Sequence, residues 1–230
     1  MQTTNGLSRV WKMGVMGAAG LAVAMAGGCN IVGIFGGMVE SYKKDSTHEI
    51  EAKFTGLRGK TVAVVVAADP AIASKFPDLI AAVTARVTER LADVQNDTDV
   101  VGVANPIEVL EYTYNHPGWA AKSRVELGKD LGGVQAIVMI EIDDYHLHDP
   151  GNAYLWNGVA QGNVGVFDLT SSTPSEYAHR TNISVKFPDK SGQGPETFSA
   201  TIVDSQLAKR FIDRASWIFY NHQEPYYPKY

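Results

Sequence analysis

The sequence lacks several features that define common classes of protein. Its 230 residues include one cysteine, so no disulfide can form within the chain. It has 20 Lys and Arg against 25 Asp and Glu, without a basic cluster, which argues against a nucleic-acid partner. No Gly-x-Ser-x-Gly nucleophile turn and no His-Glu-x-x-His motif occurs. We therefore expect a protein that is not an enzyme and does not bind nucleic acid.

The single cysteine, Cys29, follows an apolar segment near the amino terminus. Arg9 and Lys12 precede an apolar run over residues 13–26, and two glycines then lead to Cys29. A positive region, a short apolar region and small residues before a cut describe an export signal. With cysteine at the cut, the pattern resembles a bacterial lipoprotein signal peptide.

That resemblance implies removal of residues 1–28 and a lipid anchor on Cys29. A diacylglyceryl thioether and an amide-linked acyl chain such as palmitate would hold the protein at a membrane, with no other cofactor. The alternatives are an uncleaved transmembrane helix, which eight glycines within residues 13–38 disfavour, and an ordinary signal peptide. Asn30 stands where an inner-membrane retention signal has Asp, so we expect the cell envelope, at the outer membrane and facing the periplasm.

The rest of the chain predicts a tether followed by one folded domain. Residues 29–53 carry the lipidated Cys29 and read as a tether, and residues 54–230 predict a single α/β domain. Its clearest strand, 61–67, is an almost unbroken run of β-branched and small apolar residues, typical of a strand covered on both faces. The domain is expected to hold a mixed sheet of about five strands with flanking helices.

The other elements follow from turn signals and periodicity. Strands are expected at 99–103, 134–142, 153–169 and 176–187. Helices are expected at 77–94, after Asn105-Pro106, after the capping box that begins at Ser123, and at 206–220.

A polar cluster at the end of the third strand offers metal-ligating side chains. Asp144, His146 and His148 alternate along the chain, so an extended backbone would place them on one face. Imidazole and carboxylate groups suit zinc or a similar ion. A solvated strand end before Pro150-Gly151 explains the same residues without a metal.

Aromatic residues gather at two places that could contact a partner. Tyr154 and Trp156 open the hairpin, and Trp217, Tyr226 and Tyr227 lie at the carboxyl-terminal end. Tyr and Trp are enriched at protein contacts because they bury area while keeping a polar group. The alternative is that these rings pack against their own domain.

The order of elements resembles a group of bacterial envelope lipoproteins. The curli-secretion lipoprotein, the amino-terminal domain of TolB and the penicillin-binding-protein activators share such an order. Here the matching positions are Lys60 to Val64, the helix 77–94, Gly133 to Val138 and the helix 206–220. The resemblance implies an assembly, scaffold or accessory factor that acts through contact with an envelope protein or with itself. A periplasmic metal- or small-ligand-binding lipoprotein is the alternative.

Overall fold

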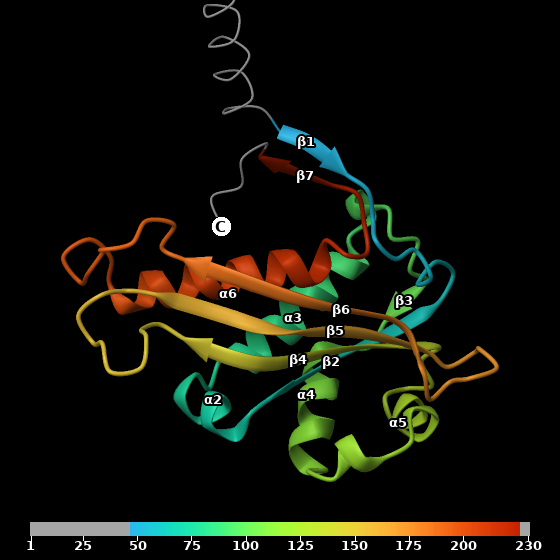
Figure 1. Cartoon of the computed structure of the whole chain (residues 1–230). Helices are drawn as coiled ribbons and strands as arrows, with labels where there is room; N and C mark the ends of the chain where they lie inside the picture. The colour runs from blue at the N-terminus through green and yellow to red at the C-terminus, as the bar shows by residue number, and fades with distance from the viewer. Residues whose placement is uncertain (1–46, 226–230) are drawn as a thin grey trace, which may run out of the picture. The chain divides into compact units, whose positions relative to one another are not determined.

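The computed structural model describes residues 47–225, all within the compact unit Tyr42–Tyr230 (Figure 1). A five-stranded sheet has the order β3-β2-β4-β5-β6, in which β2, β3 and β4 are parallel and β4, β5 and β6 are antiparallel. Its strands are β2 (Thr61–Ala68), β3 (Gly102–Val103), β4 (Ala136–His146), β5 (Gly158–Asp168) and β6 (Tyr177–Phe187). The predicted α/β domain with a mixed sheet of about five strands is confirmed.

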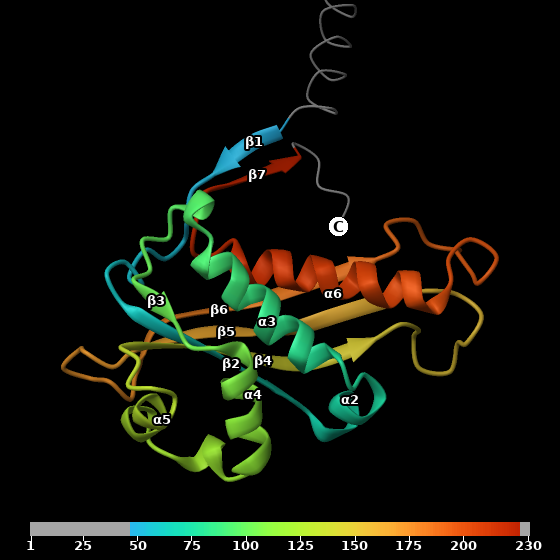
Figure 2. The ribbon, with the colours of Figure 1, turned by 180° about the vertical axis from the view of Figure 1, so that it is seen from behind.

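Helices cover both faces of this sheet, as Figures 1 and 2 show from opposite sides. The helices are α2 (Pro70–Lys75), α3 (Leu79–Ala92), α4 (Pro106–Asn115), α5 (Arg124–Asp130) and α6 (Ala200–Ser216). Helices α3 and α6 pack on one face around a large apolar cluster, and α4 and α5 pack on the other around a smaller one. Two short 3-10 turns, Val94–Asn96 and Trp119–Ala121, lie in the connections.

The apolar run that predicts β2 divides between the two cores. Val62, Val64 and Val66 point toward α3 and α6, whereas Ala63 and Val65 point toward α4 and α5. A strand with helices on both faces has no solvated side, so a continuous apolar sequence replaces the usual alternation. Strand β2 is therefore the element against which both α3 and α4 pack.

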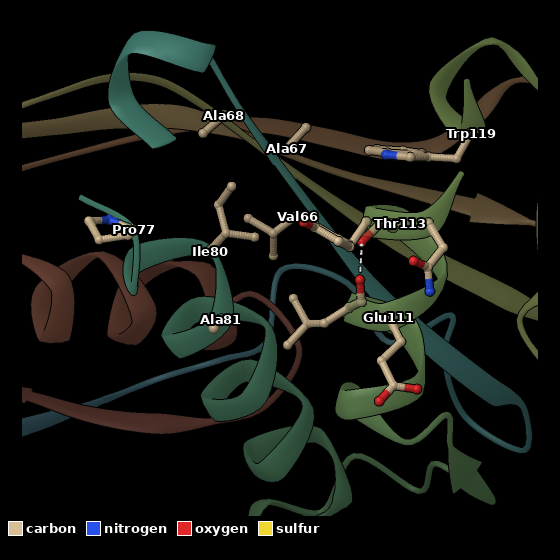
Figure 3. A pocket seen from close by; sticks show the side chains of 12 residues that line it. Val66, Ala67, Ala68, Pro77, Ile80, Ala81, Glu111, Thr113 and Trp119 are labelled. Carbon is tan, nitrogen blue, oxygen red and sulfur yellow. Dashed lines mark hydrogen bonds between the residues drawn. The ribbon is translucent and has the colours of Figure 1, made fainter. Parts of the chain in front are cut away.

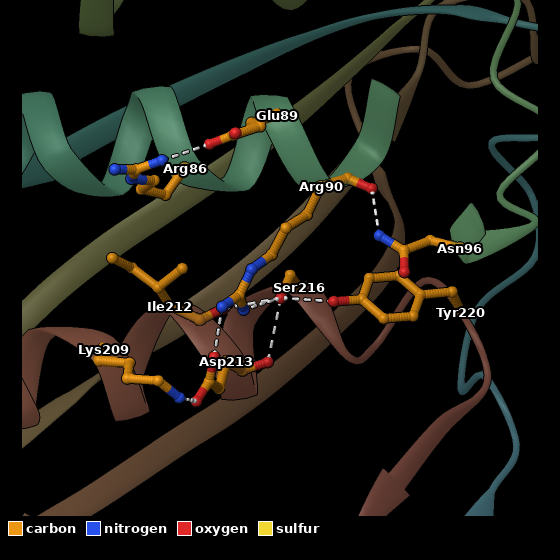
Figure 4. Close-up of polar contacts among 9 residues, drawn as sticks. All are labelled: Arg86, Glu89, Arg90, Asn96, Lys209, Ile212, Asp213, Ser216 and Tyr220. Carbon is orange, nitrogen blue, oxygen red and sulfur yellow. Dashed lines mark hydrogen bonds and ion pairs between the residues drawn. The ribbon is translucent and has the colours of Figure 1, made fainter. Parts of the chain in front are cut away.

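A polar cluster ties α3 to α6 (Figure 4). Asp213 of α6 accepts hydrogen bonds from Arg90 of α3 and, at 2.7 Å, from Lys209. Arg90 also donates to the Ser216 hydroxyl at 2.8 Å, and that oxygen lies 3.2 Å from the hydroxyl of Tyr220. Because the Asp213 side chain is only 6% exposed, this cluster holds the two helices together in a largely dry setting.

The ends of the described chain pair with each other away from the main sheet. Strand β1 (Thr47–Ile50) runs antiparallel to β7 (His222–Pro225), with Thr47 opposite Pro225 and Ile50 opposite His222. Part of the segment predicted to be a tether therefore lies in a strand, and the first and last described residues, Thr47 and Pro225, lie opposite each other.

Several boundaries differ from the sequence expectation. Asp69-Pro70 does more than end β2: the Asp69 carboxylate accepts from the Ala71 N–H and Pro70 is the first residue of α2. Helix α3 begins at Leu79 and not at Pro77, and β3 has two residues instead of the expected five. The caps at Asn105 and Ser123 form as expected, each accepting from a backbone N–H of its helix.

Within residues 47–225, no helix is long and apolar enough to cross a membrane. Cys29, Tyr226 and Tyr227 lie outside the described residues.

Candidate functional site: an apolar groove at the free edge of β2

The outer edge of β2 is paired over only part of its length. Strand β3 meets β2 at two positions, Thr61 opposite Gly102 and Val62 opposite Val103. The carbonyl groups of Lys60 and Val62 accept on this side, from Val101 N–H at 2.9 Å and Ala104 N–H at 2.8 Å. Beyond Val62, none of the described strands pairs with this edge.

The direction of the remaining backbone groups follows from the alternation of a parallel ladder. Along β2, successive residues direct their N–H and C=O groups to opposite neighbours. The Thr61 carbonyl accepts from Gln135 N–H on the β4 side, so the odd-numbered residues of β2 bond to β4. The backbone groups of Val64, Val66 and Ala68 therefore face the side that β3 leaves empty.

A groove of about 570 Å³ opens along this edge (Figure 3). Its floor is the end of β2, one wall is the start of α3 with the loop before it, and the other wall is the second half of α4 with the following turn. The lining residues are Val66, Ala67, Ala68, Pro77, Ile80, Ala81, Leu110, Glu111, Thr113, Tyr114, Asn115 and Trp119. The groove lies beyond the end of β3, where none of the described strands continues along this edge of β2.

The lining is mainly apolar, with polar groups concentrated on the α4 wall. The Thr113 hydroxyl donates to the Leu110 carbonyl at 3.0 Å, so it is turned back onto its own helix. Tyr114 is 86% exposed, and Glu111 is also exposed. Glu111 makes no ion pair or hydrogen bond with another residue of the described chain. A carboxylate beside an apolar groove suits a ligand that is apolar and positively charged.

A hydrogen-bonded cluster fixes the α4 wall. Tyr112 donates to Asp130 of α5 at 2.6 Å, and Lys122 donates to Asp130 at 2.7 Å and to the Tyr112 hydroxyl at 2.9 Å. His116 stacks on Tyr112 with ring centroids 4.5 Å apart. The hydrogen bonds that Asp130 accepts from Lys122 and Tyr112 lower the pKa of Asp130, and the hydrogen bond that Lys122 donates to Asp130 raises the pKa of Lys122. The cluster links α4, the turn that carries Trp119, and α5.

The structure brings together only two of the three predicted metal ligands. Asp144 and His146 share a face, with Oδ1 and Nδ1 2.8 Å apart. His148 lies beyond the end of β4, where its Nδ1 is 2.8 Å from the Leu155 carbonyl and its ring stacks on Trp156. In the part of the chain that the structure describes, no group of three or more His, Cys, Asp or Glu side chains could hold a metal ion.

The predicted aromatic contacts fall in different environments. Trp156 is only 6% exposed and donates its indole N–H to the Phe198 carbonyl at 2.9 Å, so it packs in its own domain. Tyr154 is 83% exposed. The sequence was compatible with partner contact and with packing in the domain for both residues. The structure buries Trp156 and exposes Tyr154, although they are only two positions apart in the chain.

Trp217 borders a second, smaller cavity of about 390 Å³ near β6 and β7. Its ring stacks on His222 at a centroid distance of 4.5 Å, and His222 and Arg214 both contact Glu224, at 3.1 and 2.6 Å. The polar groups of Arg214, His222 and Glu224 thus bond to one another, and the ion pair between Arg214 and Glu224 attaches β7 to α6. Trp217 is therefore held by its own domain on at least one face.

Sequence reasoning missed the groove. The residues that form it looked like ordinary core and helix surface, and it lies beyond the end of β3. The available signal was Asn105-Pro106: the Asn105 side chain accepts from the Ile107 N–H and Pro106 is the first residue of α4, so the chain turns away from β2 directly after β3.

No family model matches the chain, and no curated protein matches it. Solved structures with a similar arrangement include a PelC dodecamer from Paraburkholderia phytofirmans, at 8% identity and a TM-score of 0.40, covering 76% of this chain and 98% of that one.

Two further structures resemble the chain to the same degree. The lipoprotein GNA1162 from Neisseria meningitidis has 11% identity and a TM-score of 0.42, covering 67% of this chain and 96% of that one. The hypothetical protein CT253 from Chlamydia trachomatis has 14% identity and a TM-score of 0.41, covering 68% and 95%. The neighbours thus include a lipoprotein, but TM-scores this low assign neither a function nor an assembly to this chain. None of the three bears the name of the curli-secretion, TolB or activator group, so that finer resemblance stays a prediction.

Proposed function

We propose that this protein is a lipid-anchored accessory or assembly factor of the bacterial cell envelope that acts by binding another protein. Cys29 carries the lipid, the segment after it acts as the tether, and the domain presents the groove beside β2 to the partner. We infer an anchor in the outer membrane, with the domain in the periplasm, because Asn30 stands where an inner-membrane retention signal has Asp.

The observation that carries this proposal is the groove itself. It combines a mainly apolar lining, an exposed aromatic residue on its rim, Tyr114, and a carboxylate, Glu111, that has no hydrogen-bond or ion-pair partner among residues 47–225. Exposed aromatic and apolar side chains around a recess are the usual composition of a protein contact. The lipobox pattern that ends at Cys29 supplies the location.

The proposal is tested by extracting the full-length protein in mild detergent and measuring its assembled mass and its co-purifying proteins. Ala81 lies on the α3 wall and is exposed, so Ala81→Trp fills the groove from a helix surface. Ala92→Trp is the matched control, because Ala92 is exposed at the other end of the same helix.

We expect a reproducible partner or a defined oligomer with the wild type and the control, and its loss with Ala81→Trp. An identical set of co-purifying proteins and an identical mass for all three proteins would overturn the groove as the contact. Cys29→Ser tests the anchor separately, since it should release the protein from the membrane fraction without changing the groove.

A second candidate function uses the same recess. A volume of about 570 Å³ lies within the range of small-molecule sites, so an apolar cationic molecule fits the groove as well. A thermal-stability screen against small amphiphilic cations separates the two: stabilisation that Ala81→Trp abolishes, with no protein partner found, would favour the small ligand.

A further inference from the structure

We propose that the groove takes an extended segment of the partner protein, which adds to the free edge of β2 as a further strand, with a basic side chain beside Glu111. This inference rests on the proposed function and specifies how the partner is bound.

An unused strand position beside β2 is the first argument. Strand β3 occupies it only as far as Val103, after which Asn105-Pro106 turns the chain into α4. The groove lies further along β2 than the last pair with β3, Val62 opposite Val103. Val66, Ala67 and Ala68 form its floor, and α3 and α4 stand on either side. An extended segment placed there would continue the path that β3 leaves.

The backbone supplies the second argument. The N–H and C=O groups of Val66 and the N–H of Ala68 face the groove, whereas Ala67 is bonded toward β4. Strand addition satisfies such groups by main-chain hydrogen bonds, and pockets beside the strand select side chains. A helix in the groove would leave these groups without partners, because its own backbone bonds are internal.

The other edge of the sheet shows why β2 is the edge that is used. Strand β6 is eleven residues long, and its exposed side chains include Arg180, Asn182 and Lys186. Charged side chains, Lys above all, block pairing at an exposed edge. The groove end of β2 carries only Val66, Ala67 and Ala68, so it lacks that protection.

Charge defines the partner segment. The two stretches that border the groove, residues 66–81 and 106–119, carry four exposed carboxylates, Asp69, Asp78, Glu108 and Glu111, against one lysine, Lys75. Complementarity therefore favours a segment with Lys or Arg near its apolar residues. Glu111 is the carboxylate that lines the groove.

The test is a selection of random short peptides displayed on phage against the full-length protein in detergent, with the Ala81→Trp protein as counter-selection. We expect peptides that alternate apolar and polar residues and contain Lys or Arg. Their synthetic versions should bind the wild type and Ala92→Trp at least about tenfold more tightly than Ala81→Trp.

Backbone methylation decides the mode of binding. N-methylation at alternate residues in one register removes the N–H groups that face β2 and should weaken binding at least about tenfold. The same number of methyl groups in the other register should leave affinity within about threefold. A melting temperature measured for Ala81→Trp checks that this variant is folded. Glu111→Lys, a surface change, provides a second variant that should weaken binding.

Each other outcome overturns the strand proposal. Peptides that tolerate methylation in both registers, or whose apolar residues recur at helical spacing, bind the groove in another way and leave the proposed function standing. Failure to select any peptide that distinguishes the wild type from Ala81→Trp rejects strand addition, while the co-purification experiment judges the proposed function independently.

Discussion

Helix α3 meets a different neighbour on each side, and only one of the two contacts is closed. Toward its carboxyl end, Arg90 joins Asp213 and Ser216 of α6 in a nearly buried cluster (Figure 4). Toward its amino end, Ile80 and Ala81 stand across an open groove from α4 (Figure 3). The difference indicates that the two ends of α3 have different roles. The closed contact with α6 stabilises the fold, and the open side facing α4 is available for binding.

Breaking the closed contact should have the largest effect. Asp213→Ala removes the carboxylate that Arg90 and Lys209 share and leaves Arg90, whose side chain is 28% exposed, without its main partner. Because the Arg90 side chain remains partly exposed to solvent, water can stabilise its charge after the substitution. We therefore expect the free energy of unfolding to fall by about 2–3 kcal/mol, which is below the usual cost of breaking a fully buried pair.

Denaturant titration measures this loss. Lys209→Ala is the control: its side chain is 64% exposed, so its removal should cost no more than about 0.5 kcal/mol. Equal losses for the two variants would mean that the cluster contributes no more than a surface ion pair.

The helices, the strands and their core faces could be predicted from the sequence far better than the groove or the Arg90–Asp213 contact. The β-branched run of β2, the spacing of Val83, Val87 and Leu91, and the caps at Asn105 and Ser123 are local signals, and local signals specify elements and their core faces. The open edge of β2 depends on where β3 turns into α4 at Asn105-Pro106 and on how α3 and α4 then pack, and that packing is not a local property of the sequence.

The positions of the predicted metal ligands also depend on features that are not local. A shift in register between Ile142 and Asp144 changes the alternation of β4, and the strand ends at His146, so His148 turns to Trp156. The pairing of β1 with β7 joins residues at opposite ends of the chain, which no periodicity reveals.

Filling the open contact should change binding and leave stability nearly unaltered. Ala81→Trp places a large ring in the groove from an exposed helix position, so we expect an unfolding free energy within about 1 kcal/mol of the wild type. Affinity for a groove-binding peptide should fall at least about tenfold.

Denaturant and binding titrations on Ala81→Trp test directly whether this part of α3 serves binding and not stability. A loss of stability as large as that of Asp213→Ala would show that α3 and α4 are packed together at this point and that the groove is not free to receive a ligand.

Reversing the charge in the groove should have a smaller effect. Glu111→Lys replaces attraction for a basic partner by repulsion, and at an exposed position we expect affinity to fall by about three- to tenfold. The effect should shrink as salt is raised.

Glu51→Lys is the matched control, since Glu51 is exposed after β1 and the change in net charge is the same. If both variants weaken binding equally, the total charge of the domain matters and Glu111 has no local role.

The smallest effect concerns the cluster that fixes the α4 wall. The pKa of Asp130 is lowered in the folded state by hydrogen bonds from Lys122 and Tyr112, so it lies below its ordinary value of 3.8. A carboxyl group with a lowered folded pKa adds stability above its unfolded pKa, and that stability is lost as pH falls through the folded value.

In Asp130→Asn this contribution is absent at every pH. The melting temperature of the variant should therefore lie slightly below that of the wild type at pH 6, and the gap should close as pH falls below about 4. A gap that stayed constant down to pH 3 would mean that the cluster acts through packing and not through the charge of Asp130, and the α4 wall would then keep its position in acid.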